Sequence, residues 1–471
     1  MVTDDSMQRM NPVTGAIKFL LSTTLNTVLA LVFFLAVAHF QTPTFVGRVA
    51  IIQLLELTAS SALTYLSPII YTREISQSLA KHTPDTAVVG TVLTSILVAT
   101  PTLLILLLFP TYIWLSIPYL ALYVYSNTLA NIAAARGLFT QSAISAAIFS
   151  VGRWGLSAIP AYYGSVPLLI LIWTAGAAVK TAYLHLAVRG LPLKPHFSLA
   201  KQIFIEGLPL YISSILSFAS SQGDRITTAF LLGSKYLGIY QLSALIATAP
   251  LLIASAIAAA TLPAASYYVA KGLSIQKMSA LSLRFTLFLY AAFATTSLFL
   301  APIIIKTLFP AYTPGITSFK LLILATMLGT PFTYLTNFIA ISRKTLKPML
   351  YITTITATLI TITSIILIPR LGIIGAAISQ TTVQLTATAL ITIWATTTHT
   401  IKFNKREITV ISAITASAIL TYMLPQLFFT EYLLLARPAL IIDQNELKSI
   451  EEFIPEHLKF IVNTLKQIVR D

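Results

Sequence analysis

The sequence predicts an all-α polytopic membrane protein built from two six-helix bundles that are related by a parallel internal repeat. Three observations lead to this fold class. Of the 471 residues, 56% are hydrophobic and only 10% are charged, and the mean hydropathy is +0.84. The apolar residues form blocks of about 18 to 25, the length that a helix needs to cross ~30 Å of hydrocarbon. The two halves of the chain are alike at two points.

The apolar blocks predict twelve core spans, each judged against a length of about 20 residues. They cover residues 15–38, 46–70, 87–109, 111–133, 140–162, 166–187, 207–231, 237–262, 281–304, 319–341, 348–369 and 372–397. Residues 407–429 form a candidate thirteenth span, while the apolar stretch after it is too short and too charged to predict a fourteenth. Residues 443–471 form an amphipathic, soluble-looking tail, whose side of the membrane depends on the number of spans.

Basic residues predict the orientation. With the N-terminus placed in the cytoplasm, seventeen Lys and Arg fall in inner connections and five in outer ones, namely Arg48, Lys235, Lys306, Lys320 and Arg370. This is the bias that cytoplasmic loops carry. The same bias explains the net charge of +15, because Lys and Arg at the inner face attract anionic lipid headgroups. No nucleic-acid partner is therefore expected.

The internal repeat is predicted from the two sides of the polar segment "VRGLPLKPHFSLAKQ". The N-terminal bundle covers 15–187, a cytoplasmic linker covers 188–206, and the C-terminal bundle covers 207–397. In each half a Gly follows the first outer turn, Gly47 in "TFVGRVAIIQLL" and Gly238 in "KYLGIYQLSALI". Parallel repeats of this kind are typical of transporters with a central substrate site.

Five charged residues lie well inside predicted spans, away from the span ends: Glu56, Arg153, Lys180, Asp224 and Arg225. A charge within a spanning helix costs from about 2.5 kcal/mol upward, so it marks a candidate functional site. The three bases suit an anionic substrate such as a phosphate or carboxylate. We therefore assign Arg153, Lys180 and Arg225 to substrate binding, and Glu56 and Asp224 to ion coupling or to contacts between the bundles.

Structural roles for these residues remain open from the sequence. Lys180 lies where its stem could reach the inner interface, and Arg225 could reach the outer one while Asp224 pairs with a neighbouring helix. Asp224 and Arg225 are consecutive, so their side chains diverge by about 100° on a helix and cannot form a simple pair. Glu56 is either the counter-ion of Arg153 or a protonatable relay. Amides within the spans, such as Asn127 and Gln222, could line the substrate path, although such residues more often form hydrogen bonds between helices.

The sequence lacks the common motifs of metal-binding, nucleotide-binding and hydrolytic sites. There is no cysteine, the histidines never pair at metal-ligand spacing, and no phosphate loop, nucleophile elbow or zinc-protease motif occurs. No metal or cofactor is therefore expected. A membrane glycosyltransferase or polysaccharide ligase is the enzymatic alternative, but it would need sizeable outer loops with carboxylates. Transport fits the sequence better than catalysis.

Residues 206–268, from "EGLPLYISSILSFASSQGDRITTAFLLG" onward, carry a family resemblance. They resemble spans seven and eight of prokaryotic polysaccharide-biosynthesis flippases in the multidrug/oligosaccharidyl-lipid/polysaccharide exporter superfamily, archaeal members most of all. "RLGIIGAAISQTTVQL" and the tail "DQNELKSIEEFIPEHLKF" support it. The resemblance extends over nearly the whole chain, although only the span-seven block is distinctive.

The resemblance implies a flippase that moves a polyprenyl-linked oligosaccharide across the cytoplasmic membrane by alternating access. In such a protein cationic residues would meet the phosphate of the lipid, and Asp224 in "GDR" matches the family's span-seven aspartate. A convincing last helix is missing, which departs from the family's usual fourteen spans. A cation-coupled drug antiporter of the same superfamily remains the alternative, favoured if acidic residues dominate the site.

Overall fold

The computed structural model describes residues 12–188, 191–251, 275–333, 335–342 and 347–424. These residues form helices and no strands, so the predicted all-α class is confirmed. Nine stretches of the described residues are long and apolar enough to cross a membrane. One of them, Phe197–Thr248, covers predicted span seven and part of span eight. The described residues do not establish the predicted count of twelve spans.

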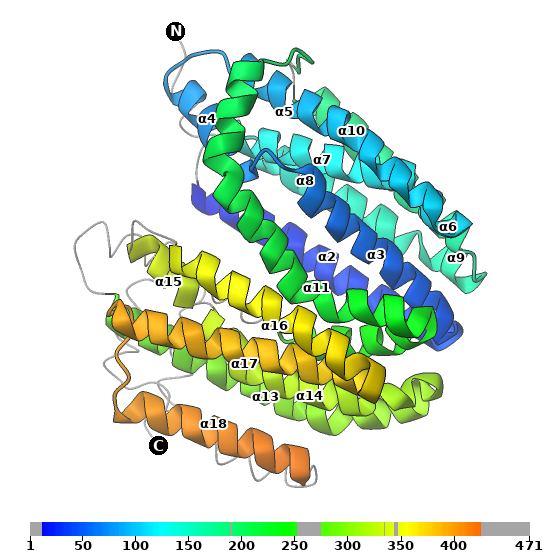
Figure 1. Ribbon diagram of the computed structural model, residues 1–471, viewed down its shortest axis with the longest axis vertical. Coiled ribbons are helices and arrows are strands. Elements are labelled where there is room, and N and C mark those ends of the chain that lie inside the picture. The colour runs from blue at the N-terminus through cyan, green and yellow to red at the C-terminus, as the bar shows by residue number, and fades with distance from the viewer. Residues whose placement is uncertain (1–11, 189–190, 252–274, 334, 343–346, 425–471) are drawn as a thin grey trace. The chain divides into compact units, whose positions relative to one another are not determined.

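The chain divides into two compact units (Figure 1), the first of which comprises Met1–Leu242 and Thr353–Ala376. Its helices begin with α2 (Pro12–Phe40), α3 (Pro43–Leu63), α4 (Pro68–Ala80), α5 (Thr86–Ala99), η1 (Thr100–Leu108), α6 (Thr111–Trp114) and α7 (Ile117–Ala135). They continue with α8 (Phe139–Ser150), η2 (Val151–Gly155), α9 (Ala158–Tyr162), α10 (Val166–Ala187), most of α11 (Phe197–Thr248) and most of α16 (Lys347–Leu371).

The second unit comprises Ser243–Ile352 and Ala377–Asp471. Its helices are α13 (Gln276–Leu308), η3 (Pro310–Gly315), α14 (Ile316–Thr333), α15 (Leu335–Ser342), most of α17 (Ile373–Thr397) and α18 (Lys405–Met423). Helix α18 covers residues 407–423 of the candidate thirteenth span. The end of that span, residues 425–429, and the tail at 443–471 lie outside the described residues. The division into two bundles of six spans remains a prediction.

Local sequence signals set several helix ends. Pro43 begins α3 after Thr42, whose hydroxyl accepts a hydrogen bond from the Phe45 N–H, and proline suits this first position because its missing N–H has no partner there anyway. Helix α18 begins with a capping box, in which Asn404 and Glu407 each bond to the other's backbone. Gly137, with φ of 75°, follows the end of α7, where a left-handed residue closes the helix.

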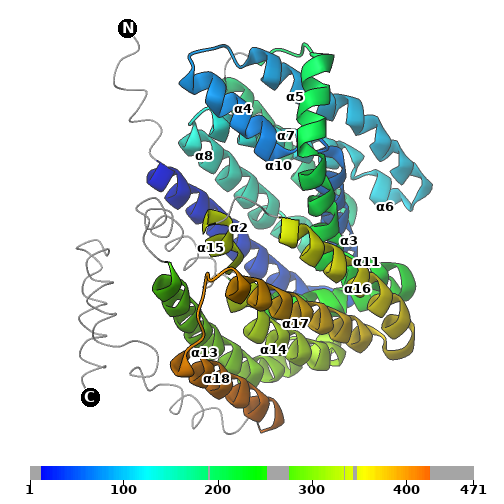
Figure 2. The same cartoon turned by 60° about the vertical axis from the view of Figure 1, so that its left-hand side comes forward.

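The first unit is held together by helix packing around α7, which contacts α3, α4, α5, α8 and α10. Helices α5, α7 and α10 lie side by side in both views (Figure 1 and Figure 2). Large apolar side chains such as Leu108, Leu171 and Phe230 are nevertheless exposed. Exposed apolar residues on this scale are typical of helices that face hydrocarbon.

Helix α11 reverses direction at Gly233, which adopts φ of 81° and ψ of 179°. The hydroxyl of Tyr240 donates to the Asp224 carboxylate sixteen residues earlier. On a straight helix those residues would lie about 24 Å apart, so the hydrogen bond requires a hairpin. The predicted end of span seven at 231 and the predicted start of span eight at 237 flank this break.

Gly47 of α3 and Gly238 of α11 meet where the two helices cross. A Cβ added to Gly47 would collide with the backbone carbonyl of Ser234, and a Cβ on Gly238 would collide with that of Pro43. Only glycine permits helix backbones to approach so closely. The two glycines that the sequence singles out as equivalent points of a repeat therefore contact each other directly.

The second unit has a buried ion pair of its own. Helix α13 packs against α14 and α18, and the three lie side by side in both views (Figure 1 and Figure 2). Arg284 Nε of α13 lies 3.5 Å from Glu407 Oε1 of α18, and both side chains are buried. This pair ties α18 to the rest of the unit.

Candidate functional site

The candidate site in the first unit begins with a local widening of the helix at η2. Here the Leu156 N–H donates to the Val151 carbonyl at 3.2 Å, which closes a π-type turn. Such turns occur mostly as single insertions within α-helices, often at functional sites. The indole N–H of Trp173 donates to the Arg153 carbonyl at 3.0 Å and to the Ser157 hydroxyl at 2.8 Å. The widening is thereby anchored to α10.

Arg153, in the middle of this turn, forms a bidentate ion pair with Glu56 of α3. Its Nη2 lies 2.5 Å from Glu56 Oε2 and its Nη1 lies 2.9 Å from Oε1. The Tyr119 hydroxyl also donates to Glu56 Oε2. Both charged side chains are about 5% exposed or less. Arg153 and Tyr119 thus both donate to the Glu56 carboxylate.

Aromatic rings enclose the Arg153 guanidinium. Its Cζ lies 4.2 Å from the ring centroid of Trp154, 4.5 Å from that of Trp173 and 5.6 Å from that of Phe149. Cations are attracted to aromatic faces within about 6 Å. Arg153 Nε has no hydrogen-bond partner. The rings and Glu56 together stabilise a charge that is withdrawn from water.

Lys180 of α10 lies in the same bundle. The side chain is 3% exposed, its Nζ donates to Asn127 Oδ1 at 2.5 Å, and the Nζ lies 5.2 Å from the Phe149 centroid. Among the ion pairs of the described residues, none involves Lys180. A buried lysine therefore lies near the Glu56–Arg153 pair without a carboxylate of its own.

Asp224 and Arg225 bind different partners. Asp224 is 2% exposed, and its Oδ2 accepts from the Tyr240 hydroxyl, while its Oδ1 has no hydrogen-bond partner. Arg225 Nη1 donates to Gln222 Oε1 at 3.0 Å on the same helix. Both side chains thus bind along the α11 hairpin.

The structure brings Glu56, Arg153 and Lys180 into one cluster from α3, η2 and α10. Asp224 and Arg225 form a separate pair of contacts on α11. We call the first three residues, with Tyr119 and Asn127, the charged cluster. The five residues chosen from the sequence therefore occupy two places in the first unit.

Sequence reasoning missed other charged contacts. Asp85 and Arg136 form a bidentate pair at 2.6 and 2.9 Å, which holds the end of α7 to the start of α5. Arg73 bonds to both Glu74 and Glu206 at the surface, and these hydrogen bonds raise the pKa of the Arg73 guanidinium above its ordinary value. In the second unit, the capping-box pattern from Asn404 to Glu407 is a sequence signal that predicts the start of α18.

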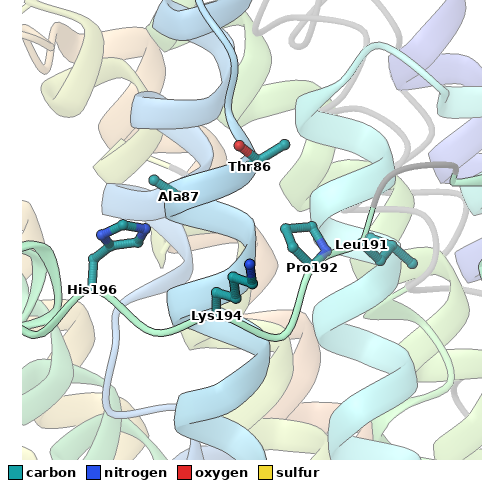
Figure 3. Close-up of a pocket in the computed structure, with 6 residues that line it drawn as sticks. All are labelled: Thr86, Ala87, Leu191, Pro192, Lys194 and His196. Carbon is teal, nitrogen blue, oxygen red and sulfur yellow. The ribbon is translucent and has the colours of Figure 1, made fainter.

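A shallow pocket of about 500 Å³ lies elsewhere in the first unit. Figure 3 shows its lining at the start of α5 and along the segment before α11, namely Thr86, Ala87, Leu191, Pro192, Lys194 and His196. Lys194 and His196 are exposed, and none of the five candidate residues lines the pocket. No group of three or more His, Asp or Glu in the described part of the chain could hold a metal ion.

Comparison with known proteins gives a clear answer on the fold. No family model matches the sequence, and no curated protein matches it either. Among solved structures, the chain is similar to lipid II flippase MurJ in an inward closed conformation, with a TM-score of 0.58 and 15% identity over 89% of this chain and 96% of that one. It has the fold of a transporter.

Two further structures support the same fold. One is an outward-facing multidrug resistance MATE family transporter of the MOP superfamily, with a TM-score of 0.55 and 15% identity over 88% of this chain and 99% of that one. The other is a MOP superfamily transporter from Pyrococcus furiosus, described as having a binding pocket of reverse polarity, with a TM-score of 0.53 and 14% identity over 88% and 99%. Identities this low show the fold alone.

Proposed function

We propose that this protein is a flippase that moves a polyprenyl-phosphate-linked oligosaccharide across the cytoplasmic membrane by alternating access, for the assembly of cell-surface polysaccharide. The N-terminus lies in the cytoplasm in this proposal. The fold shared with MurJ and MATE transporters supports membrane transport but leaves the substrate open. The observation that supports an anionic substrate is the balance of basic and acidic groups among the buried side chains.

The charged cluster holds Arg153 and Lys180 against a single carboxylate, Glu56. A site whose basic side chains outnumber its carboxylates favours anions in low-dielectric surroundings, because the base without a carboxylate can take a proton and pair with the anion. A phosphate or diphosphate linkage is the anionic part of a polyprenyl-linked sugar. Arg225, half-buried on α11, is the third cation of the proposed path. Glu56 and Asp224 are assigned to ion coupling or to contacts between moving parts.

One observation favours a second candidate, the cation-coupled antiporter of organic cations. Asp224 Oδ1 is buried and has no hydrogen-bond partner, and an unsatisfied carboxylate oxygen in the interior is costly unless it meets a cation or a proton. In the flippase this carboxylate would serve a coupling ion. In the antiporter it would also receive the transported cation.

The experiment that tests the proposal measures flipping of a fluorescent polyprenyl-diphospho-oligosaccharide in liposomes that contain the purified protein. We expect Arg225→Gln to slow flipping roughly tenfold, because a hydrogen bond to a charged group contributes about 1.5–3 kcal/mol. Arg370→Gln is the matched control, since Arg370 is exposed at the end of α16, and it should flip at the wild-type rate.

Organic cations distinguish the alternatives in the same liposomes. If the wild type leaves the lipid in place and moves an organic cation along a Na⁺ or H⁺ gradient, and Asp224→Asn abolishes that movement, the antiporter is the correct function. Equal flipping rates for Arg225→Gln and Arg370→Gln would remove Arg225 from the proposed path.

A further inference from the structure

Lys180 differs from Glu56 and Arg153, the other two charged residues of the charged cluster, in its partners. The Glu56 oxygens accept from both terminal nitrogens of Arg153 and from the Tyr119 hydroxyl, so the negative charge of Glu56 is already matched by Arg153. Lys180 has only the neutral oxygen of Asn127. The cluster therefore carries one surplus positive charge whenever Lys180 is an ammonium ion.

The elements packed against α10 offer no second counter-charge. They are α3, α7, α8, η2 and α9, and their titratable groups facing this region are Glu56 of α3, Arg153 of η2, and Tyr119 and Tyr123 of α7. Helix α8 contributes no ionisable side chain. On α10 itself the other titratable side chains are Tyr183 and His185, and His185 bonds to Tyr125.

The hydrogen bonds of Lys180 suit an amine better than an ammonium ion. An ammonium ion has three donors, of which one meets Asn127 at 2.5 Å. The Phe149 ring, 5.2 Å from Nζ, offers a weaker attraction than a carboxylate would. A buried charge without a paired charge is costly, and shedding the proton removes that cost.

We propose that Lys180 is a proton-binding site that couples protons to the anionic substrate. In this proposal Lys180 gives up its proton in the enclosed state and becomes a neutral amine. When the site opens and the phosphate of the lipid enters, the amine takes one proton from water and pairs with the phosphate, and the proton returns to water when the lipid leaves. The inference rests on the proposed function, because the anionic lipid supplies the missing counter-charge.

The proposal predicts the direction in which pH changes substrate binding. A group that is neutral in the free protein and protonated in the complex makes binding weaker as the pH rises. We expect the Kd for a short-chain polyprenyl diphosphate to rise about tenfold per pH unit, and we expect on the order of one proton to be taken up per bound lipid. A pH-indicator dye in weakly buffered detergent measures this uptake directly on the wild type.

Two substitutions and a control isolate Lys180. Lys180→Met removes the proton site with little change in length, and Lys180→Arg keeps a permanent charge, so both should abolish proton uptake and flatten the pH dependence of binding. Lys201→Met replaces an exposed lysine of α11 and should behave as the wild type. Thermal melting of each variant identifies any that fails to fold. Proton uptake by the wild type tests the proposal even if a variant does not fold.

Each outcome decides the question. Binding by the wild type with no proton uptake, or full uptake by Lys180→Met, overturns the role of Lys180 and leaves the flippase proposal intact. Wild-type protein that neither binds nor flips the diphosphate lipid overturns both proposals. Uptake by the wild type and Lys201→Met that is lost in Lys180→Met establishes the proton site.

Discussion

Glu56→Gln is expected to lower the free energy of unfolding by about 3–5 kcal/mol, the usual cost of leaving one partner of a buried ion pair alone. The affected side chains are only 4% and 6% exposed, so water cannot replace the lost carboxylate. An amide also offers one acceptor oxygen where Arg153 and Tyr119 now use two. Thermal melting and titration with a denaturing detergent both measure the loss.

The double variant Glu56→Gln with Arg153→Met separates structure from transport. Removing both charges should recover most of the lost stability, because the buried charge without a partner is then gone. If Arg153 serves only the fold, flipping returns together with stability; if it meets substrate, flipping stays low in a stable protein. Arg73→Gln is the control, since the ion pairs of Arg73 lie at the surface. Glu56→Gln as stable as this control would contradict the buried pair.

Gly238→Val is expected to destabilise the protein by roughly 3 kcal/mol or more, the upper range for overpacking. The new side chain would start where the Pro43 carbonyl oxygen lies, and the Gly47 nitrogen is 2.8 Å away. Both are backbone atoms of α3 that cannot rotate aside. The crossing of α3 and α11 must therefore open, which separates α11 from Ala50 and Leu54 of α3.

Gly176→Ala is the matched control for the crossing. Gly176 lies within α10, and a Cβ there meets its nearest atom at 3.8 Å, an ordinary contact. Since alanine favours helices by about 1 kcal/mol over glycine, this variant should be as stable as the wild type or slightly more so. Equal melting temperatures for Gly238→Val and Gly176→Ala would show that the two helices do not cross at these glycines.

The sequence predicts the fold class because hydropathy and span length are local properties. It also singles out four charged residues that the structure buries, namely Glu56, Arg153, Lys180 and Asp224, because a charge in an apolar helix is costly wherever it lies. The pairing of Glu56 with Arg153, 97 residues away in sequence, depends on how two helices are rotated against each other. The π-type turn that carries Arg153 likewise has no clear signature in "VGRWG".

Other parts of the structure show why sequence patterns alone are insufficient. Gly47 and Gly238 stand out as similar motifs, yet only packing reveals that each occupies the space that the other's side chain would need. Arg284 and Glu407 fall at predicted span ends, where charges normally reach water. Their burial follows from the docking of α18 against α13, a tertiary contact that no local pattern predicts.

The most direct test of the account compares two lipids in liposomes that contain the wild-type protein. Both carry the same polyprenyl chain and the same oligosaccharide, joined by a diphosphate in one and by a neutral ether in the other. We predict that the diphosphate lipid is flipped at least about tenfold faster, because the buried Lys180 has no carboxylate partner and an anion supplies the missing counter-charge. Equal flipping of the two lipids, or movement of organic cations alone, would contradict an anionic substrate.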